Sequence, residues 1–278
     1  MPSFASPTDG ARLHYTDYGP AGGPAVVFLS SSYFGTEMWE HQTLPLASGG
    51  LRCVALDRRG HGRSDDVWDG FDLDTLADDV GGLLDHLNLR NVTLVGHSVG
   101  AAEAVRHVTR QDGGRVARLA LVSGVTPGLV RSPDNPDGWD PAAMAAGNEE
   151  FRKDRHAFFD AGVDAFFAFD RPGNELSASR VRYLLDRIEI CTARAGQALG
   201  DTLLTADLAA EMTKLRVPVL IAHGTHDTSA PLDLTGRRAA ELAPRSTLRV
   251  YENAGHGLFV THAEQLTADL RTFATEGA

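Results

Sequence analysis

The sequence is poor in cysteine, with only Cys53 and Cys191 among 278 residues. Cys53 opens the apolar run 53–56, where a small hydrophobic side chain is expected to be buried. Two isolated thiols do not make the framework of a disulfide-stabilised domain. The fold therefore depends on a hydrophobic core, for which 42% hydrophobic residues are ample.

Long hydrophobic runs and an excess of basic residues are also missing. No stretch approaches about 18 uninterrupted apolar residues, and residues 1–15 do not join a basic segment to an apolar one. We therefore expect neither membrane insertion nor export, and a cytoplasmic location. The formal net charge of -11 opposes binding to nucleic acid and to anionic membranes, because these partners are negative too.

Signals for a cofactor or a metal are equally scarce. The glycine-rich segment 19–24 lacks the lysine of a phosphate-binding loop and precedes an apolar run instead of linking a strand to a helix. The 11 histidines show no spacing typical of zinc ligands. His61 is interpreted as part of a structural turn. We expect no cofactor and no metal.

Short apolar runs bounded by turn residues are abundant. They are typical of strands buried on both faces of a mostly parallel sheet, with crossover helices between them. Apolar residues recur every three or four positions over 73–87, which predicts a helix. Segment 11–18 is expected to hold an early antiparallel strand. The predicted parallel strands are 25–29, 53–56, 92–95, 119–122, 217–222 and 247–250.

The alternation of strands and helices lapses between residues 124 and 212. We interpret 1–123 and 213–278 as an α/β core and 124–212 as a helical cap inserted over the carboxyl edge of the sheet. Within the cap, 181–203 is predicted to form a helix or a helix pair. Ordinary core packing is the alternative for the aromatic side chains of this segment, which are Phe158, Phe159, Phe166, Phe167 and Phe169.

The most informative segment reads VTLVGHSVGAA over residues 92–102. It places Ser98 in Gly-x-Ser-x-Gly between a β-branched strand and the small residues that open a helix, which predicts a nucleophile elbow. Gly96 and Gly100 would remove side chains that collide across this sharp turn. The alternative, a surface serine between two turn glycines, fits poorly with the apolar strand before it.

A serine hydroxyl needs an adjacent base, usually a histidine that a carboxylate orients. Asp227 follows the predicted strand 217–222, and His256 lies between two glycines just past the last strand. Each residue alone is compatible with an ordinary turn. Their order after the nucleophile, at three strand ends, predicts a triad of Ser98 as nucleophile, His256 as general base and Asp227 as orienting acid.

With these motifs the chain resembles the cofactor-free haloperoxidase and arylesterase branch of the α/β-hydrolase superfamily, almost from end to end. The most specific stretch is ALDRRGHGRS at 55–64, which continues through VWDG at 67–70 and ADDV at 77–80 to the elbow. The resemblance implies the α/β-hydrolase fold and the same triad. Members of this branch include esterases, lactonases and perhydrolases. Relatives often self-associate, so a homo-oligomer is a possible state.

One loop departs from the family pattern, which has a His-Gly pair after its third strand. Here the segment 30–33 reads SSSY. Counting back from Trp39, which matches a family tryptophan, the resemblance puts Ser32 at the oxyanion position, with Val99 as the second backbone donor. Backbone N–H groups persist through side-chain changes if the loop keeps its path. Tyr33 is a candidate hydroxyl donor in the acyl pocket.

The sequence thus predicts a serine hydrolase that cleaves a small, mainly apolar carboxylic ester or lactone through an acyl-enzyme on Ser98. Two alternatives stay open: a perhydrolase or haloperoxidase that uses peroxide instead of water, and a non-catalytic ligand-binding protein on the same fold. The sequence does not specify the acyl group or the leaving group. The candidate pocket residues are Tyr33, Phe34, His97, Phe158, Phe166 and Leu258.

Overall fold

A central sheet dominates the computed structural model, which describes residues 1–110 and 114–276. Its strand order is β1-β2-β4-β3-β5-β6-β7-β8. Strands β3 to β8 pair in parallel, whereas β1 and β2 are antiparallel to their neighbours. The strands are β1 (Ser3–Ala5), β2 (Arg12–Tyr18), β3 (Ala25–Leu29), β4 (Arg52–Leu56), β5 (Val92–His97), β6 (Val116–Val122), β7 (Val219–Gly224) and β8 (Ser246–Tyr251).

The predicted strands are all present, and their limits differ by a few residues. Strand β6 begins three positions before the predicted 119–122, and β2 is the antiparallel strand predicted in 11–18. Strand β7 begins just after Pro218, because a proline nitrogen cannot donate to the ladder. Strand β1 was not predicted, since three residues are too short to show an alternating pattern.

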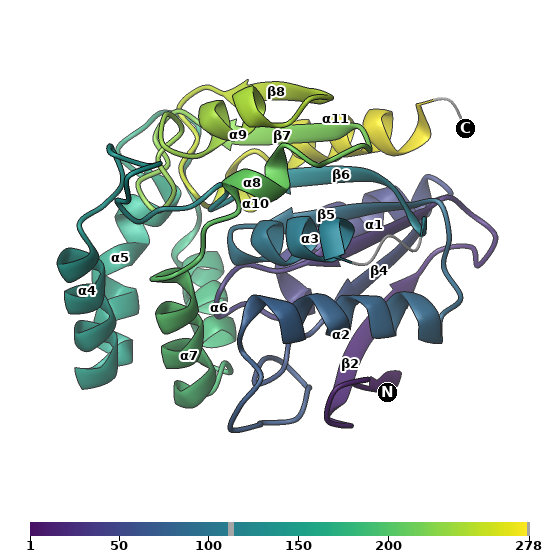
Figure 1. Cartoon of the computed structure of the whole chain (residues 1–278), viewed down its shortest axis with the longest axis horizontal. Coiled ribbons are helices and arrows are strands. Elements are labelled where there is room, and N and C mark those ends of the chain that lie inside the picture. The colour runs from purple at the N-terminus through teal and green to yellow at the C-terminus, as the bar shows by residue number, and fades with distance from the viewer. Residues whose placement is uncertain (111–113, 277–278) are drawn as a thin grey trace.

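Helices cover both faces of the sheet (Figure 1). Alternation along β3 supplies both layers: Val27 and Leu29 join one core cluster, while Val26 and Phe28 join the other. Each fully buried side chain of this kind contributes about 1.5–3 kcal/mol. The first cluster takes in α2 (Leu73–His86), α3 (Val99–Arg110), α8 (Ala209–Met212) and α9 (Gly236–Leu242), and the second takes in α1 (Glu40–Ser48), α10 (Leu258–Thr261) and α11 (Ala263–Thr275).

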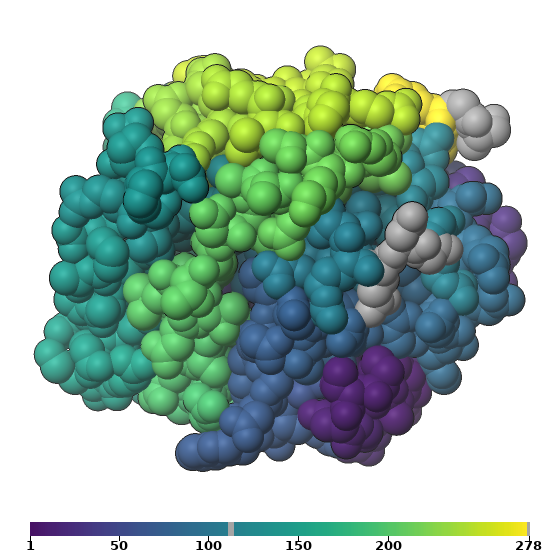
Figure 2. Space-filling view, in the orientation of Figure 1, coloured from purple at the N-terminus to yellow at the C-terminus, as the bar shows by residue number. Residues whose placement is uncertain are grey.

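A group of helices between β6 and β7 gathers at one end of the sheet, on the left of Figures 1 and 2. The side chains of Asp140, Asp154, Ser177 and Thr192 accept backbone N–H groups at their first turns, which is why the helices begin where they do. The predicted helix or helix pair at 181–203 is a pair. The helices are α4 (Pro141–Lys153), α5 (Arg155–Phe167), α6 (Ala178–Ile188) and α7 (Ala193–Leu203).

Two further properties of the described residues bear on the expectations above. Cys53 and Cys191 are both free and buried. Across 1–110 and 114–276, the helices are too short or too polar to cross a lipid bilayer.

Candidate active site

Ser98 lies at the sharp turn between β5 and α3. Its φ of 55° is in the left-handed region, which costs a residue with a side chain about 1–2 kcal/mol. A Cβ on Gly96 would lie 2.2 Å from the carbonyl oxygen of Gly100, and a Cβ on Gly100 would lie 2.6 Å from that of Leu29. The Ser98 N–H donates to the carbonyl of Val122 at 3.1 Å, so the sheet itself holds the strained turn.

Asp227 and His256 meet from the loops that follow β7 and β8. Nδ1 of His256 lies 2.8 Å from Oδ2 and 3.0 Å from Oδ1 of Asp227, and both side chains are buried. Oδ1 also accepts the backbone N–H groups of Ser229 and Ala230, at 3.0 and 2.8 Å.

The electrostatics of this pair favour an ionised acid. Burial acts to raise the pKa of Asp227, but His256, His223 and the backbone donors outweigh it and hold the pKa below its ordinary value. An ionised carboxylate only accepts hydrogen bonds, so it fixes the proton of His256 on Nδ1. Nε2 of His256 is then left as the basic atom.

Two other buried histidines surround the pair. Nε2 of His97 lies 2.9 Å from the carbonyl oxygen of His256, and the two rings meet edge to face at 4.7 Å between centroids. Nε2 of His223 lies 2.6 Å from the carbonyl oxygen of Ala230 and 3.4 Å from Oδ2 of Asp227. Burial lowers the pKa of both rings. They are therefore neutral at pH 7, and a positive charge on His256 meets no like charge from them.

The loop after β3 carries the residues that replace the expected His-Gly pair. The Ser30 hydroxyl donates to the carbonyl of Gly35 at 2.8 Å, and the Ser31 N–H lies 3.3 Å from Sδ of Met38. From below, the guanidinium of Arg58 donates to the carbonyl oxygens of Ser30 and Ser31, at 2.8 and 3.2 Å. The path of the loop is thus set by its own hydroxyl and by a buried cation.

A cavity of about 730 Å³ is lined by Ser98, Ser32 and His256 together. Most of its wall is apolar and comes from α4 to α7 and from the loop after β6. The charged side chains of Glu150, Lys153 and Asp154 on its lining are exposed. The apolar and aromatic lining residues include Tyr33, Phe34, Val125, Leu129, Trp139, Met144, Phe158, Phe159, Phe166, Phe167, Leu184 and Ile188.

Tyr33, Phe34, Phe158 and Phe166 of the predicted pocket line this cavity. The prediction was wrong for His97 and Leu258, which are fully buried behind the wall. The side chain of His97 leaves β5 on the sheet face that carries Trp39 and Phe259, and its ring meets both of theirs. Leu258 opens α10 and packs in the second core cluster.

The ring of Tyr33 packs against two phenylalanines of the helices above the loop. Its ring stacks on Phe151 of α4 at 5.3 Å and meets Phe159 of α5 edge-on at 5.0 Å. Burial, with the Cys191 thiol adding to it, raises the pKa of the Tyr33 phenol. We find its backbone in the left-handed region, with φ of 72°. The aromatic ring of Tyr33 therefore packs between the loop after β3 and helices α4 and α5.

The other predicted oxyanion residue, Val99, is the first residue of α3. Its side chain is buried beside Phe71 and Cys191, away from the cavity. Its backbone N–H belongs to the first turn of the helix, where such groups have no partner within the helix. Ser32 thus lines the same cavity as Ser98, and Val99 directly follows Ser98 in the chain.

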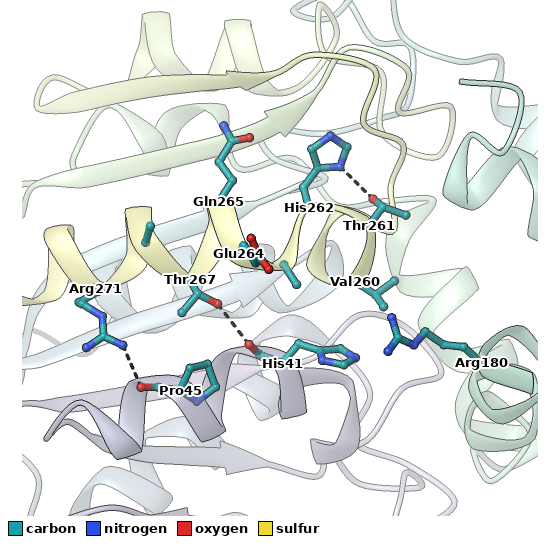
Figure 3. Close-up of a pocket in the computed structure, with 12 residues that line it drawn as sticks. His41, Pro45, Arg180, Val260, Thr261, His262, Glu264, Gln265, Thr267 and Arg271 are labelled. Atoms are coloured by element: carbon teal, nitrogen blue, oxygen red, sulfur yellow. Dashed lines mark hydrogen bonds between the residues drawn. The ribbon is translucent and has the colours of Figure 1, made fainter. Parts of the chain in front are cut away.

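A second hollow, of about 800 Å³, lies between α1 and α11 (Figure 3). Two of its polar side chains already bind the protein: the Thr267 hydroxyl donates to the carbonyl of His41 at 3.2 Å, and Arg271 donates to that of Pro45 at 2.8 Å. None of the three triad candidates lines it. It is separate from the candidate active site.

The sequence did not reveal the buried contacts that support the loop after β3. The stretch around His61 was interpreted as a structural turn, and His61 is indeed buried with Nδ1 at 2.8 Å from the carbonyl of Arg59. The contacts of Arg58 in the same stretch with Ser30, Ser31 and Glu103 were not predicted, because these partners are distant in sequence. Within 1–110 and 114–276, no group of three or more His, Cys, Asp or Glu side chains is arranged to hold a metal.

Comparison with known proteins gives a consistent result. Residues 22–263 match the family model described as the alpha/beta hydrolase fold. The chain is 35% identical to a non-heme chloroperoxidase of Kitasatospora aureofaciens, over 95% of this chain and 96% of the relative. It is 34% identical to a bifunctional esterase/perhydrolase of Acinetobacter calcoaceticus, over 97% and 98% of the two chains. The crystal structure of a bromoperoxidase from Bacillus anthracis superposes with a TM-score of 0.92 at 30% identity and covers 98% of both chains.

The fold and these matches define the class of protein: the chain belongs to the α/β-hydrolase fold family and is an enzyme of that family. Within it, the chain lies in the cofactor-free haloperoxidase-like branch that the motifs at 55–64 and 92–102 indicated. The predicted fold class is confirmed.

Proposed function

We propose that the chain hydrolyses carboxylic esters or lactones through an acyl-enzyme on Ser98. The observation that carries this proposal is the buried Asp227–His256 pair, whose histidine shares one cavity with a serine in a strained turn. The relative named an esterase/perhydrolase, similar over almost its whole length, supports it.

In the proposed mechanism, Nε2 of His256 takes the proton of the Ser98 hydroxyl as Oγ attacks the ester carbonyl. The carbonyl oxygen becomes negative and accepts hydrogen bonds from the backbone N–H groups of Ser32 and Val99. Asp227 stabilises the imidazolium. His256 then returns the proton to the leaving alcohol, and water attacks the acyl-enzyme by the same route in reverse.

We further propose that residues 124–212 act as a cap that selects the substrate. The apolar wall supplied by α4 to α7 favours an uncharged substrate with apolar groups, because a buried charge without a partner costs several kcal/mol. The exposed Glu150 and Lys153, which pair at 2.7 Å, stand on the solvent side of this wall.

The test is turnover of short p-nitrophenyl esters by the wild type, Ser98→Ala and Ser229→Ala. Ser229 offers a matched control, since it lines the same cavity and Asp227 uses only its backbone N–H. We expect Ser98→Ala to lose roughly 10³-fold or more in kcat, and Ser229→Ala to stay within about threefold of the wild type. Equal rates for Ser98→Ala and the wild type would refute the proposal. Tight binding without turnover in the wild type would favour the ligand-binding alternative.

Perhydrolysis is the second candidate, favoured by the names of the relatives, which include non-heme chloroperoxidases and an esterase/perhydrolase. In this reaction, peroxide replaces water as the acceptor of the acyl group from Ser98, and the product is a peracid. Peroxide-dependent bromination of a dye in acetate buffer measures it. Bromination that disappears with Ser98→Ala would establish this activity beside ester hydrolysis.

A further inference from the structure

The buried guanidinium of Arg58 connects two segments whose relative position matters for the proposed reaction. It donates to the carbonyl oxygens of Ser30 and Ser31 on the loop after β3, at 2.8 and 3.2 Å. It also forms an ion pair with Glu103 of α3, the helix whose first residue follows Ser98. The side chains of Arg58 and Glu103 are 5% and 3% exposed, so solvent hardly weakens the link.

The geometry of a peptide bond makes one of these contacts special. The carbonyl of Ser31 and the N–H of Ser32 belong to one planar trans peptide and point in opposite directions. A donor that fixes the carbonyl oxygen of Ser31 therefore fixes the direction of the Ser32 N–H. The positive charge of Arg58 on that oxygen also polarises the same peptide, which strengthens its N–H as a donor.

The second end of the link lies on α3. Glu103 stands four positions after Val99, so the two residues lie on the same side of the helix. Close backbone contact adds to the link, since a Cβ on Gly100 would lie 2.6 Å from the carbonyl oxygen of Leu29 and 2.9 Å from that of Ser30. The loop and the helix thus meet directly, and the ion pair holds them together.

We propose that Arg58, anchored by Glu103, is a positioning residue that aims the Ser32 N–H at the developing oxyanion. This inference rests on the proposed ester hydrolysis at Ser98 and adds a requirement that the triad alone does not contain. The replacement of the usual His-Gly pair by two serines leaves this loop with Arg58 as its charged support. Arg58 touches neither substrate nor reacting atoms and acts only through the Ser31–Ser32 peptide.

The chain offers a matched control one position further on. Arg59 is also fully buried and forms an ion pair with Asp79, at 2.9 Å, and a bond to Ser6, at 3.2 Å. These partners lie on α2 and near the amino terminus. Replacing the guanidinium of Arg59 therefore measures what a buried ion pair contributes to stability, and it leaves the loop after β3 unchanged.

The experiment compares Arg58→Lys and Arg59→Lys, since a lysine keeps the charge but cannot reach two carbonyls and a carboxylate at once. The probe is trifluoroacetophenone: Oγ of Ser98 adds to its carbonyl carbon, the proton passes to His256, and the carbonyl oxygen becomes an oxyanion. Acetophenone, which is too unreactive to form this adduct, reports binding of the neutral ligand.

We expect Arg58→Lys to lower kcat about 10- to 100-fold, with KM changed less than about threefold. Binding of trifluoroacetophenone should weaken by the same factor as kcat/KM, and binding of acetophenone should not change. Arg59→Lys should lower Tm as Arg58→Lys does and keep kcat within about twofold. Equal losses of kcat in both variants, or wild-type kcat in Arg58→Lys, would overturn the inference.

If Arg58→Lys does not fold, the double variant Arg58→Met with Glu103→Leu replaces it, because it leaves no buried charge unpaired. The same loss of kcat and of trifluoroacetophenone binding is expected, and wild-type values would overturn the inference. Ser98→Ala, measured in parallel, distinguishes failure of the proposed hydrolysis from failure of the proposed positioning by Arg58. Retained turnover in Ser98→Ala refutes the proposed function, whereas its loss together with a fully active Arg58→Lys refutes only the positioning by Arg58.

Discussion

At the scale of single residues, the buried carboxylate of Asp227 contacts two histidines and two backbone N–H groups. It is bonded to His256 and to two backbone N–H groups, and His223 lies 3.4 Å away. The lowered pKa of Asp227 keeps it ionised at neutral pH. A neutral group of the same shape at this position would leave a developing imidazolium without its counter-charge.

Asp227→Asn tests this contribution. We expect kcat for a p-nitrophenyl ester to fall about 10³- to 10⁴-fold, because an amide removes the charge and favours the wrong tautomer of His256. Steady-state kinetics at pH 7 measure the loss. Asp233→Asn is the control, since Asp233 follows on the same loop and is exposed. An Asp227→Asn enzyme within tenfold of the wild type would contradict the assigned role of the carboxylate.

The residues of the candidate site were predictable where local sequence carries the constraint. Ser98 is marked by two glycines that the turn requires, and Asp227 and His256 are marked by their positions after strands. Arg58 was not predictable as a support, because its contact with Glu103 joins residues 45 positions apart. A buried arginine in a glycine-rich stretch is a signal, but its partner becomes visible only in the fold.

At the scale of the elements, glycines in two helices differ in whether the packing around them leaves room for a side chain. Gly100 in the first turn of α3 allows backbone contact with the end of β3. Gly147, in the interior of α4, has no atom within 4 Å of a built Cβ. The first glycine is a packing requirement, whereas the second only adds entropy to the unfolded chain.

Gly147→Ala should raise the free energy of unfolding by about 0.5–1 kcal/mol, because alanine has the higher helix propensity and its Cβ meets no atom within 4 Å. Gly100→Ala should destabilise the protein by several kcal/mol, because backbone atoms of Leu29 and Ser30 cannot both move aside. Urea unfolding measures both changes. Stabilisation by Gly100→Ala, or a loss of more than 1 kcal/mol in Gly147→Ala, would contradict this interpretation.

The helices above the cavity were the elements that sequence resolved least. Each buried strand is a short apolar run that can be recognised from neighbouring residues alone, so the positions of the strands were predicted well. All four helices α4 to α7 contribute residues to the cavity wall, but the buried face of α7 packs on the cluster that contains Phe71 and Val99. Phe158 of α5 is exposed at the cavity. Their limits follow from capping side chains such as Asp154, which are individually common in loops as well.

At the scale of the whole molecule, His61 joins the sheet-bearing part of the chain to the helices above the cavity. Its Nδ1 bonds the carbonyl of Arg59, and its Nε2 lies 3.4 Å from Sγ of Cys191, just before α7. Burial, followed by the charge of Arg58, lowers the pKa of His61 to about 3. The folded protein therefore holds this ring neutral, while the unfolded chain protonates it below about pH 6.5.

This difference predicts a loss of stability in acid. Between pH 6.5 and 3 the unfolded state binds the additional proton, so the contribution of His61 falls as pH falls through this window. Relative to His61→Gln, the wild type should lose about 1.6 kcal/mol of unfolding free energy between pH 6.5 and pH 5. Urea unfolding at several pH values measures the difference. Unfolding free energies that change equally with pH in the wild type and in His61→Gln would contradict the prediction.

The arrangement of β6 and β7 has a consequence for how enzymes of this architecture diversify. These two strands are hydrogen-bonded neighbours, yet the chain between them runs through five helices, α4 to α8. Because this segment leaves and rejoins the sheet at adjacent strands, its length and composition can vary without breaking hydrogen bonds between β6 and β7. A graft of this segment from another family member would therefore exchange the apolar wall of the cavity while the strand ends below keep their alignment.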